Sequence, residues 1–393
     1  MKEKVKLIRM TTVPISMNII LKGQLSFINQ FYEVIGVTGY DTKHFEECKN
    51  REGIRMQVVE MSRTISVFKD FQSLIKLFLF FKKEKPGIVH SHTPKAGLLG
   101  MLAAWLANVP VRLHTVGGMP LTETKGFKRM LLSAMERLTY ACAHRIYPNS
   151  LGLLKIIQQE NFCPNHKLHV LANGSSNGVN VDYFNPEALG NPEEVRTIWR
   201  SKMNVNPTAL VFCFVGRIAR EKGITELIEA FDQLRNTFRE QEFKLLLIGL
   251  FEKMYGALTT DIQHIIRSHP DIIAPGRFDD VRPYYLLSDV YVFPSYREGF
   301  PNTLLEAGAM GLPIIATNIN GCNEIVTEGV NGLLIAPKRS DELFQAMKKV
   351  IDPKFRKDMG QRSRMIIEEK FKRTILWDEL LEQYDKYCLE KGL

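Results

Sequence analysis

Short runs of β-branched and other apolar residues alternate with longer amphipathic stretches along the chain, and this alternation restricts the fold more than any other feature. In the first half we expect strands at 5–12, 33–38, 56–60, 87–91, 110–116, 144–148 and 168–171. Between them we expect helices near 20–30, 67–83, 95–107, 126–142 and 149–160. Such strand–helix alternation predicts an α/β fold with a parallel, doubly wound sheet.

The sequence changes character over 172–207, where Asn, Gly, Ser and Pro are frequent, and we interpret this part as the connection between two domains. A second alternation follows it. Strands are expected at 209–215, 243–249, 271–274, 289–293, 313–316 and 332–335. Helices are expected near 223–238, 256–267, 281–287, 302–310 and 340–350. The tail 353–390 should also be helical, with one apolar face made of Trp377, Leu380, Leu381, Tyr384 and Tyr387.

The length and the pattern together predict two Rossmann-like domains that face each other across a cleft. The expected boundaries are 1–190 for the first domain, 191–375 for the second and 376–393 for a C-terminal helix. No GxGxxG follows the first strand, which argues against a dehydrogenase, and no GxxxxGK[ST] occurs, which argues against a P-loop hydrolase.

Cysteine usage and the amino terminus bear on the compartment. The six cysteines are scattered with no CxxC spacing, which argues against a zinc site and against a disulfide framework. The first residues are basic, but their apolar stretch is too short and interrupted for a signal peptide. No run of about 18 uncharged apolar residues occurs, so no transmembrane helix is expected. We therefore expect a cytoplasmic protein.

The positive charge is concentrated in the first half. Residues 1–190 contain 24 Lys and Arg against 14 Asp and Glu, a net charge of +10, whereas residues 191–393 carry −1, which together make the +9 of the chain. A basic half is typical of a protein that meets an anionic partner: nucleic acid, a membrane surface or a phosphorylated ligand. The alternative is a surface that is merely basic.

The first motif that points to chemistry is VFCFVGRIAREKG, at 211–223. An apolar strand ends there, Gly216 turns the chain, and Arg217 and Lys222 follow just before the next helix. Two cations beside a helix N-terminus suit a diphosphate, which Arg binds in a bidentate way and Lys as a point charge. The alternative is a basic loop that forms ion pairs with Glu221 or Glu226.

The second motif lies at 288–317, where a buried strand runs into a loop and a short helix. Glu298 precedes that helix, and Glu306 lies inside it, eight positions later. Glu306 is placed to accept hydrogen bonds from the ribose of a nucleotide, and Glu298 to reach a transferred sugar. The backbone N–H groups at the helix start would face the phosphates; they belong to Asn302, Thr303 and Leu304. Alternatively, Glu306 is a surface helix residue and Glu298 an ordinary loop acid.

In this order and spacing the two motifs resemble those of glycosyltransferase family 4, retaining enzymes with the GT-B fold. The resemblance covers almost the whole chain, including the connection at 177–180 and a C-terminal helix that returns to the N-terminal domain. It implies that Arg217, Lys222 and Glu298 act in catalysis and that Gly216 also lines the donor site. It also implies a nucleotide sugar as substrate, no cofactor and no metal, in line with the lack of a DxD-like acidic cluster beside a strand end.

The N-terminal half resembles bacterial capsule and O-antigen glycosyltransferases, over 21–39, 88–118 and 145–150. This resemblance implies a UDP-sugar donor, an N-acetylhexosamine or related sugar, and a polyprenyl-diphosphate-linked saccharide as acceptor at the inner face of the membrane. The acceptor side would include Pro14, Ser16, His90, His92, Lys95, Gly117 and Gly118. Relatives often carry His where this chain has Gly117, so His114 either acts in its place or belongs to the scaffold.

Two further regions have predicted roles in binding. Gly249 ends a strand, and Arg277 and Phe278 resemble the segment that holds the nucleobase, although Phe278 is equally compatible with a core position. The stretches 66–86 and 125–140 combine apolar faces with Lys and Arg, which suits an anionic membrane surface. Within 66–86 we assign Leu74, Leu77 and Phe78 to the core and expect Lys82, Lys83 and Lys85 to face lipid.

Two other functions remain possible from the sequence alone. A GT-B epimerase that acts on UDP-N-acetylglucosamine would share the donor site, but the Glu298 and Glu306 pair beside Arg217 and Lys222 favours transfer. A basic nucleic-acid-binding protein is the alternative from another class. It is not favoured, because no helix-turn-helix, zinc-finger or RNP-like pattern is found.

Overall fold

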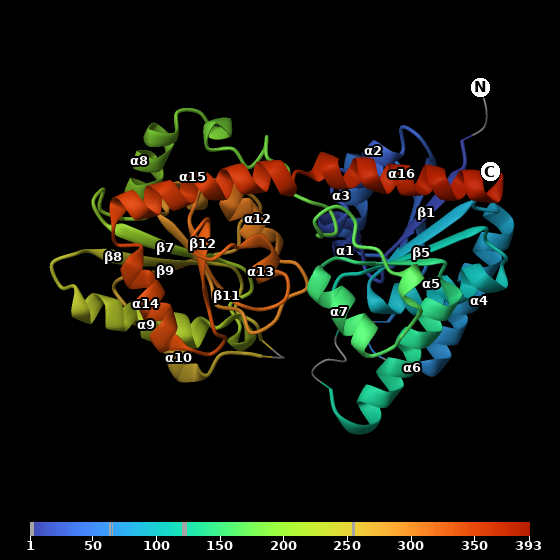
Figure 1. The fold of residues 1–393 in the computed structure, drawn as a ribbon, viewed down its shortest axis with the longest axis horizontal. Coiled ribbons are helices and arrows are strands. Elements are labelled where there is room, and N and C mark those ends of the chain that lie inside the picture. The colour runs from blue at the N-terminus through green and yellow to red at the C-terminus, as the bar shows by residue number, and fades with distance from the viewer. Residues whose placement is uncertain (1–3, 63, 65, 120–123, 254–255) are drawn as a thin grey trace. The chain divides into compact units, whose positions relative to one another are not determined.

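A computed structural model describes residues 4–62, 64, 66–119, 124–253 and 256–393, which form two compact units (Figure 1). Unit 1 comprises Met1–Asn177 and Thr374–Leu393, and unit 2 comprises Gly178–Arg373. The division falls at 177/178 rather than at residue 190, for a local reason. The side chain of Asn177 accepts hydrogen bonds from Trp377 Nε1 (2.8 Å) and Gln24 Nε2 (3.1 Å), in unit 1. Val179 instead exchanges backbone hydrogen bonds with Phe371 and Arg373, in unit 2.

The sheet of unit 1 has six parallel strands in the order β3-β2-β1-β4-β5-β6. The strands are β1 (Lys6–Met10), β2 (Glu33–Thr38), β3 (Arg55–Val58), β4 (Ile88–His92), β5 (Val111–Val116) and β6 (Arg145–Pro148). The central strands are buried on both faces, as parallel sheets covered by helices require. The strand order reverses between β1 and β4, where the sheets of this class bind ligands at their carboxyl ends.

Helices cover both faces of this sheet, and Figure 1 shows α2 and α16 on one side and α4, α5 and α6 on the other. The first face carries α1 (Pro14–Ile20), α2 (Gln24–Ile28), α3 (Thr42–Glu52) and α16 (Arg373–Lys391). The second carries α4 (Val67–Glu84), α5 (Pro94–Leu106), α6 (Gly126–Cys142) and α7 (Leu151–Gln159). Each face has its own apolar core.

Unit 2 repeats the same strand order, because its sheet reads β12-β11-β10-β7-β8-β9 and is again parallel. The strands are β7 (Leu210–Val215), β8 (Phe243–Ile248), β9 (Ile272–Gly276), β10 (Val290–Phe293), β11 (Ile314–Thr317) and β12 (Gly332–Ile335). Here the order reverses between β7 and β10. The predicted α/β class and the two doubly wound sheets are therefore confirmed.

The helices of unit 2 also lie on two sides of their sheet. Figure 1 shows α9 (Ile224–Thr237), α10 (Thr260–Ser268) and α14 (Ser340–Lys349) on one side. The other side carries α8 (Pro192–Lys202), α12 (Asn302–Ala309) and α15 (Pro353–Lys370). Helix α11 (Arg282–Leu287) packs on α8, and a short α13 (Cys322–Ile325) follows β11. One large apolar core joins the helices to the strands.

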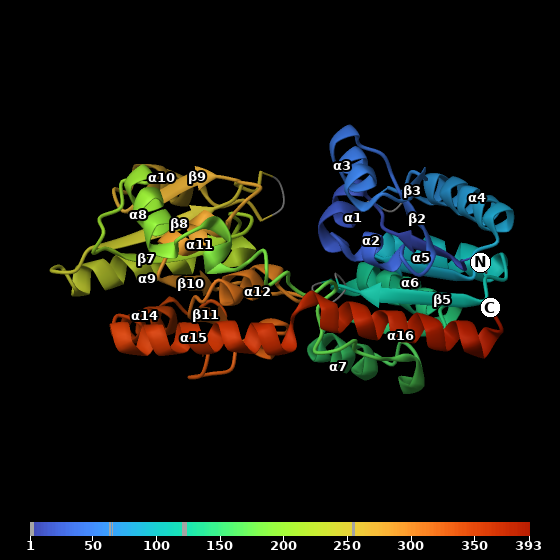
Figure 2. The same ribbon diagram turned by 90° about the horizontal axis from the view of Figure 1, so that it is seen from above.

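The C-terminal helix returns to unit 1 and runs along its sheet in both views (Figure 1, Figure 2). Four residues of its predicted apolar face are buried and Leu381 is partly buried; the four are Trp377, Leu380, Tyr384 and Tyr387. Tyr384 donates or accepts a hydrogen bond of 2.6 Å with His90 of β4. Among the described residues, no helix combines the length and the apolar character needed to cross a membrane.

Some expected elements are absent or interrupted. The stretch 168–171 is not a strand, because only Leu168 bridges to Ile146 before the chain leaves the sheet edge. The helix expected at 20–30 is broken at Gly23, which has a left-handed backbone (φ 79°) and separates α1 from α2. The helices α3 and α8 were not expected. Both are strongly polar, and Asp41 and Asn191 cap their N-termini.

Candidate functional site

The predicted donor residues of unit 2 follow the two strands at which the strand order reverses. Gly216, Arg217 and Lys222 lie in the loop after β7, and Glu298 lies in the loop after β10. Because β7 and β10 are neighbours in the sheet, their carboxyl ends bring the two loops together. This is the position where open α/β sheets bind ligands.

The Lys222 ammonium forms an ion pair with the Glu298 carboxylate, and both side chains are largely buried. The Glu298 Oε1 atom also accepts a hydrogen bond of 2.8 Å from the Ser295 hydroxyl. Asn320 fixes the same loop by donating to the Glu298 carbonyl oxygen at 3.1 Å. The structure therefore brings the Lys222 cation and the Glu298 anion together at the carboxyl ends of β7 and β10.

Glycines allow two close backbone approaches at the ends of these strands: Gly223 lies against the loop after β10, and Gly249, which follows β8, lies against Gly216. Gly223 begins α9 with a left-handed backbone (φ 69°), and a Cβ atom there would lie 2.1 Å from the Pro294 carbonyl oxygen. A Cβ atom on Gly249 would lie 1.8 Å from the Gly216 carbonyl oxygen. Such distances exclude any side chain, so glycine is required at both positions.

Arg217 is held differently from Lys222. Its guanidinium forms ion pairs with Glu252 (2.5 Å) and Glu221 (3.0 Å), and its side chain is 56% exposed. The ion pair with Glu221 is one of the two alternatives considered for this loop, whereas Glu226 instead accepts a hydrogen bond of 2.6 Å from Tyr296. Because exposed ion pairs contribute at most about 1 kcal/mol, an incoming diphosphate can exchange them for its own oxygens.

Helix α12 carries the other predicted donor residues. Asn302, Thr303 and Leu304 form its first turn, where the N–H groups of a helix carry positive partial charge. The Leu304 N–H donates to the Pro301 carbonyl oxygen at 3.2 Å. Glu306 follows one turn later and accepts a hydrogen bond of 3.2 Å from the buried Tyr285 hydroxyl. Glu306 also contributes to the raised pKa of Tyr285, whose main cause is burial.

The sequence does not predict a polar group made of Tyr183, Asp280 and Arg282, of which Tyr183 interacts with Glu306. The ring of Tyr183 stacks on the Arg282 guanidinium at 3.6 Å, and Asp280 forms an ion pair with Arg282 at 2.6 Å. The pKa of Tyr183 is raised by burial and by the charge of Asp280, with a smaller effect from Glu306. Tyr183 comes from the Asn- and Gly-rich connection, which we had interpreted only as a linker.

The predicted base-binding residues lie after β8 and β9. Gly249 N donates to the Gly276 carbonyl oxygen at 2.9 Å, so the ends of the two strands are joined. Phe278 stacks on Tyr284 with ring centroids 4.6 Å apart, yet remains partly exposed. Arg277 is also exposed and lies 4.0 Å from Asp279. Both side chains are thus at the surface rather than in the core.

In unit 1 the predicted acceptor residues differ in accessibility. Gly117 is exposed and Gly118 partly so, after β5. Ser16 is partly buried and Pro14 buried, at the start of α1. Lys95 is buried and forms an ion pair of 2.5 Å with Asp70, so its charge is already matched. Of these five residues, Gly117 is the one that is exposed.

The three candidate histidines are buried. His114 packs against Gly97, donates or accepts a 2.9 Å hydrogen bond with Ser91, and burial lowers its pKa to about 4. This placement favours the scaffold alternative over a catalytic role for His114. His90 and His92 stack with centroids 4.5 Å apart, and burial lowers the pKa of both well below the usual value. All three are neutral at pH 7.

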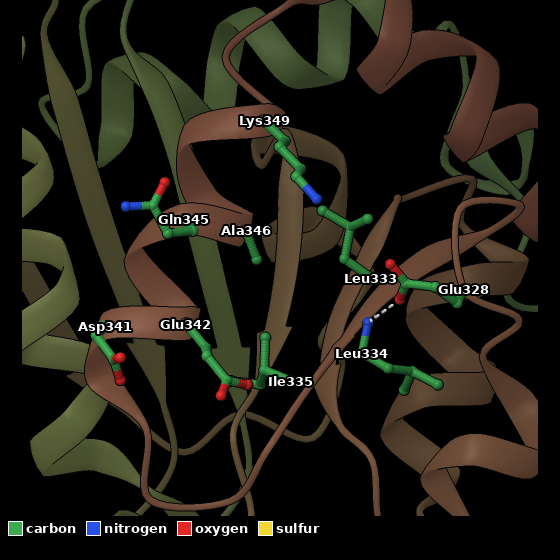
Figure 3. A pocket seen from close by; sticks show the side chains of 9 residues that line it. All are labelled: Glu328, Leu333, Leu334, Ile335, Asp341, Glu342, Gln345, Ala346 and Lys349. Atoms are coloured by element: carbon green, nitrogen blue, oxygen red, sulfur yellow. Dashed lines mark hydrogen bonds between the residues drawn. The ribbon is translucent and has the colours of Figure 1, made fainter.

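Two other features do not build a catalytic site. Among the described residues, no three His, Cys, Asp or Glu side chains group as metal ligands. A surface hollow of about 300 Å³ lies between β12 and α14 (Figure 3). There Glu328 accepts a hydrogen bond from Leu334 N (2.5 Å), and Glu342 accepts one from Ala336 N (2.8 Å). These carboxylates occupy the free edge of the sheet, which protects it from pairing with another chain.

Two family models match this chain. Glycosyl transferases group 1 matches residues 195–365, and the glycosyl transferase 4-like domain matches residues 31–174. The first match contains every predicted donor residue, and the second contains the helices α4 to α6. Each match lies within one of the two units.

Individual proteins extend the likeness to the whole chain. The capsular polysaccharide biosynthesis glycosyltransferase CapM of Staphylococcus aureus is 33% identical and covers 98% of both chains. A UDP-Gal:alpha-D-GlcNAc-diphosphoundecaprenol alpha-1,3-galactosyltransferase of Escherichia coli is 31% identical over 85% of this chain and 84% of its own. The crystal structure of Anabaena Alr3699/HepE in complex with UDP has a TM-score of 0.79 at 17% identity, covering 98% of this chain and 100% of that one.

Proposed function

Because this chain belongs to glycosyltransferase family 4 and has the GT-B fold, we propose that it transfers a sugar, an N-acetylhexosamine or related sugar, from a UDP-sugar to a polyprenyl-diphosphate-linked saccharide. Transfer proceeds with retention at the anomeric carbon. In the reaction the bond from the sugar to the donor diphosphate breaks, and a bond to an acceptor hydroxyl oxygen forms as that hydroxyl loses its proton. Family membership favours this reaction over the epimerase and the nucleic-acid-binding alternatives.

The observation that carries the proposal is the Lys222–Glu298 ion pair at the reversal point of the unit 2 sheet. A leaving diphosphate gains negative charge as its bond to the sugar breaks, and a fixed cation stabilises that charge. Lys222 supplies this cation, and the exposed Arg217 supplies a second one. Glu298, held beside Lys222, is positioned for the hydroxyls of the transferred sugar.

The rest of the nucleotide is assigned to the neighbouring elements. The first turn of α12, Asn302 to Leu304, offers N–H groups to the phosphates. Glu306 accepts hydrogen bonds from the ribose, with Tyr285 fixing its carboxylate. The uracil lies against Gly249, Arg277 and Phe278, of which Phe278 presents a partly exposed ring. The charge on the diphosphate is met by residues of the chain, so the transfer needs no metal.

The lipid-linked acceptor is supported by the relatives and by charge. The Escherichia coli relative and a Campylobacter jejuni relative, 23% identical, are named for acceptors linked to diphosphoundecaprenol. The net charge of +10 in residues 1–190 suits a diphosphate acceptor and an anionic bilayer. We place the acceptor on unit 1, beside Pro14, Ser16, the exposed Gly117 and the partly exposed Gly118.

Helix α4 supports a peripheral position at the inner face of the cell membrane. Its solvent face carries a row of exposed apolar side chains: Val67 (81% exposed), Phe68 (73%), Phe71, Ile75 and Leu79. Exposed lysines border this row; they are Lys69, Lys76, Lys82 and Lys83. An exposed apolar row flanked by cations is the pattern of an interfacial helix on an anionic surface. We therefore propose that the bilayer, rather than a protein, covers this face.

A transfer assay tests the proposed reaction. Purified protein is incubated with radiolabelled UDP-sugars and a membrane lipid fraction, with and without excess EDTA. We expect label from one UDP-N-acetylhexosamine or a related donor to enter the lipid fraction, and EDTA not to prevent it. The same donor should raise the melting temperature, because it binds the folded state. Conversion of the donor without transfer to lipid would favour an epimerase instead, and complete loss in EDTA would contradict metal independence.

A further inference from the structure

Arg9 is a fully buried cation in the central strand of unit 1. Its side chain is 0% exposed in β1, beside His90 and His92 of β4. The Nη2 atom donates to Gln24 Oε1 at 2.5 Å and contacts His92 Nε2 at 2.8 Å. The Tyr384 hydroxyl is the other group that interacts with the guanidinium. Across the part of the chain that the structure describes, no carboxylate pairs with Arg9.

The same chain shows how a buried arginine is ordinarily matched. Arg200 is 3% exposed, and its Nη2 atom forms an ion pair with Asp289 at 2.8 Å. Its Nε atom donates to the Leu287 carbonyl oxygen, and its Nη1 atom to backbone carbonyl oxygens of 206–209. A guanidinium stays charged in proteins, and burying it without a counter-charge is strongly unfavourable. Arg9 therefore lacks the anion that Arg200 has.

Arg9 lines a small cavity in unit 1. Its lining includes Arg9, Gln24, His92, Thr115, Asn149 and Leu380. Within the described residues, three buried nitrogens of the lining have no hydrogen-bond partner: Arg9 Nε, Arg9 Nη1 and His92 Nδ1. The Asn149 Oδ1 atom, an acceptor of the same lining, also has none. The centre of a sphere the size of a water molecule can move within about 10 Å³ of this cavity. The cavity therefore has room for one small particle and not for a phosphate group.

The tautomer of His92 follows from its contact with Arg9. A guanidinium N–H only donates, so His92 Nε2 must accept, and the proton of the neutral ring must then lie on Nδ1. Burial keeps the pKa of His92 well below its usual value, so the ring is neutral. His92 Nδ1–H is consequently a third donor, beside the two of Arg9.

We propose that this cavity, the Arg9 pocket, binds one small monovalent anion such as chloride. Arg9 and His92 line it, three of their N–H donors have no partner, and no carboxylate among the described residues matches the guanidinium charge. Water would satisfy hydrogen bonds but would leave that charge unmatched, and the volume excludes polyatomic anions such as sulfate. The Arg9 pocket takes no part in the proposed sugar transfer. The experiments that test anion binding therefore do not depend on the proposed function.

Thermal melting in different salts tests the pocket. At constant ionic strength, the parent protein should melt about 2–4 °C higher in sodium chloride than in sodium gluconate, whose anion is too large, with a saturating dependence on chloride. Arg9→Met should lose this difference. Arg239→Met, which removes an exposed arginine, should retain it. A chloride effect that is absent from the parent, or that Arg9→Met retains, would overturn the proposal.

Diffraction supplies a test that does not rely on a variant that must fold. Crystals of the parent soaked in bromide should show an anomalous peak within hydrogen-bond distance of Arg9 Nε or Nη1 and of His92 Nδ1. Density for water alone at that position, or bromide bound only at the surface, would refute the anion site.

Discussion

Lys222 and Arg217 carry the positive charge of the proposed donor site but are held by different partners. Replacing either residue by alanine should lower kcat by about two orders of magnitude or more, as for loss of one group that stabilises the transition state. Initial rates of transfer measure the loss, and melting temperatures verify that the variants fold. Lys348→Ala, an exposed lysine of α14, is the matched control. If a variant keeps nearly the activity of the parent, the replaced residue does not stabilise the leaving diphosphate.

The roles of Glu306 and Glu298 can be distinguished by comparing the binding of UDP with the binding of the intact UDP-sugar. Glu306→Ala should weaken UDP about 10- to 100-fold, because charge-assisted hydrogen bonds to the ribose contribute about 1.5–3 kcal/mol. Glu298→Ala should leave UDP affinity nearly unchanged while weakening the intact donor or slowing transfer. Calorimetry with UDP and with the UDP-sugar measures both. Equal losses for UDP in the two variants would contradict this division.

Tyr285→Phe is a finer test of Glu306. It removes only the hydroxyl that donates to the carboxylate at 3.2 Å and keeps the buried ring. We expect a smaller loss of UDP affinity than in Glu306→Ala, because the carboxylate remains but is less firmly oriented. An unchanged affinity would show that Tyr285 does not position Glu306.

The buried histidines should make the protein sensitive to acid. Burial lowers the pKa of His114 to about 4, whereas an unfolded histidine titrates near 6.5. Between these values the unfolded state binds more protons, so the free energy of unfolding falls as pH drops from about 6.5 to about 4. His114 alone accounts for about 3 kcal/mol, and His90 and His92 act in the same direction.

Urea unfolding at pH 7.5, 6 and 5 measures this effect. His144 offers a variant, because burial and the charge of Arg112 lower its pKa to about 4 and its Nδ1 accepts from Arg112 N. His144→Asn retains an acceptor without a titrating group and should reduce the pH dependence. A stability that does not change between pH 7.5 and 5 would contradict the prediction.

Among the elements, α4 has the clearest consequence for partners. The protein should sediment with anionic liposomes at low salt and be released as salt screens the charges. Changing Lys82, Lys83 and Lys85 to Glu should reduce binding, since each cation near the surface contributes about 1 kcal/mol. Changing Phe68 and Phe71 to Ser should also reduce binding and should do so at low salt, because it removes apolar insertion.

The control for α4 is a charge reversal of equal size in unit 2, at the exposed Lys348, Lys349 and Lys354. This variant should bind liposomes like the parent, and all variants should keep their UDP affinity. Binding that is unchanged in both α4 variants would exclude this helix and leave 125–140 as the next candidate. No binding of the parent at any salt concentration would favour a soluble acceptor.

The strands could be predicted from the sequence far better than the short polar helices. Buried parallel strands such as β7 and β8 are continuous apolar runs, so their signal is strong. The helices α3 and α8 are stabilised by caps and by a narrow buried stripe, which periodicity detects poorly. The stretch 168–171 has the composition of a strand, but only Leu168 pairs with the sheet, through Ile146. Whether such a stretch joins the edge of a sheet depends on the tertiary structure.

For the site, residue types and spacing identified the loops but not the partners. The Lys222–Glu298 pair joins residues 76 positions apart, and no local pattern encodes it. The sequence does suggest the ion pair between Arg217 and Glu221, because the two residues are four positions apart. It does not suggest the ion pair between Arg217 and the more distant Glu252. Tyr183 and Arg282 were missed because a contact between two distant aromatic and basic residues leaves no signature in the sequence.

For the molecule as a whole, the division into units predicts how fragments behave. Unit 2 is one continuous segment with its own core, so residues 178–373 should fold cooperatively and bind UDP. Residues 1–177 alone should not fold stably, because the core of unit 1 includes Leu376, Trp377, Leu380 and Tyr384 of α16. Circular dichroism melting and calorimetry test both fragments. A cooperative melt of residues 1–177 would contradict this prediction.

The return of α16 to unit 1 also sets an order of events during synthesis. The ribosome makes all of unit 2 before it makes the helix that completes the core of unit 1. Nascent N-terminal domains usually fold first. In this chain residues 1–177 must instead wait, with the side of their sheet that α16 will cover still exposed to the cell's chaperones. The second unit to be translated is thus the first that can reach its native state.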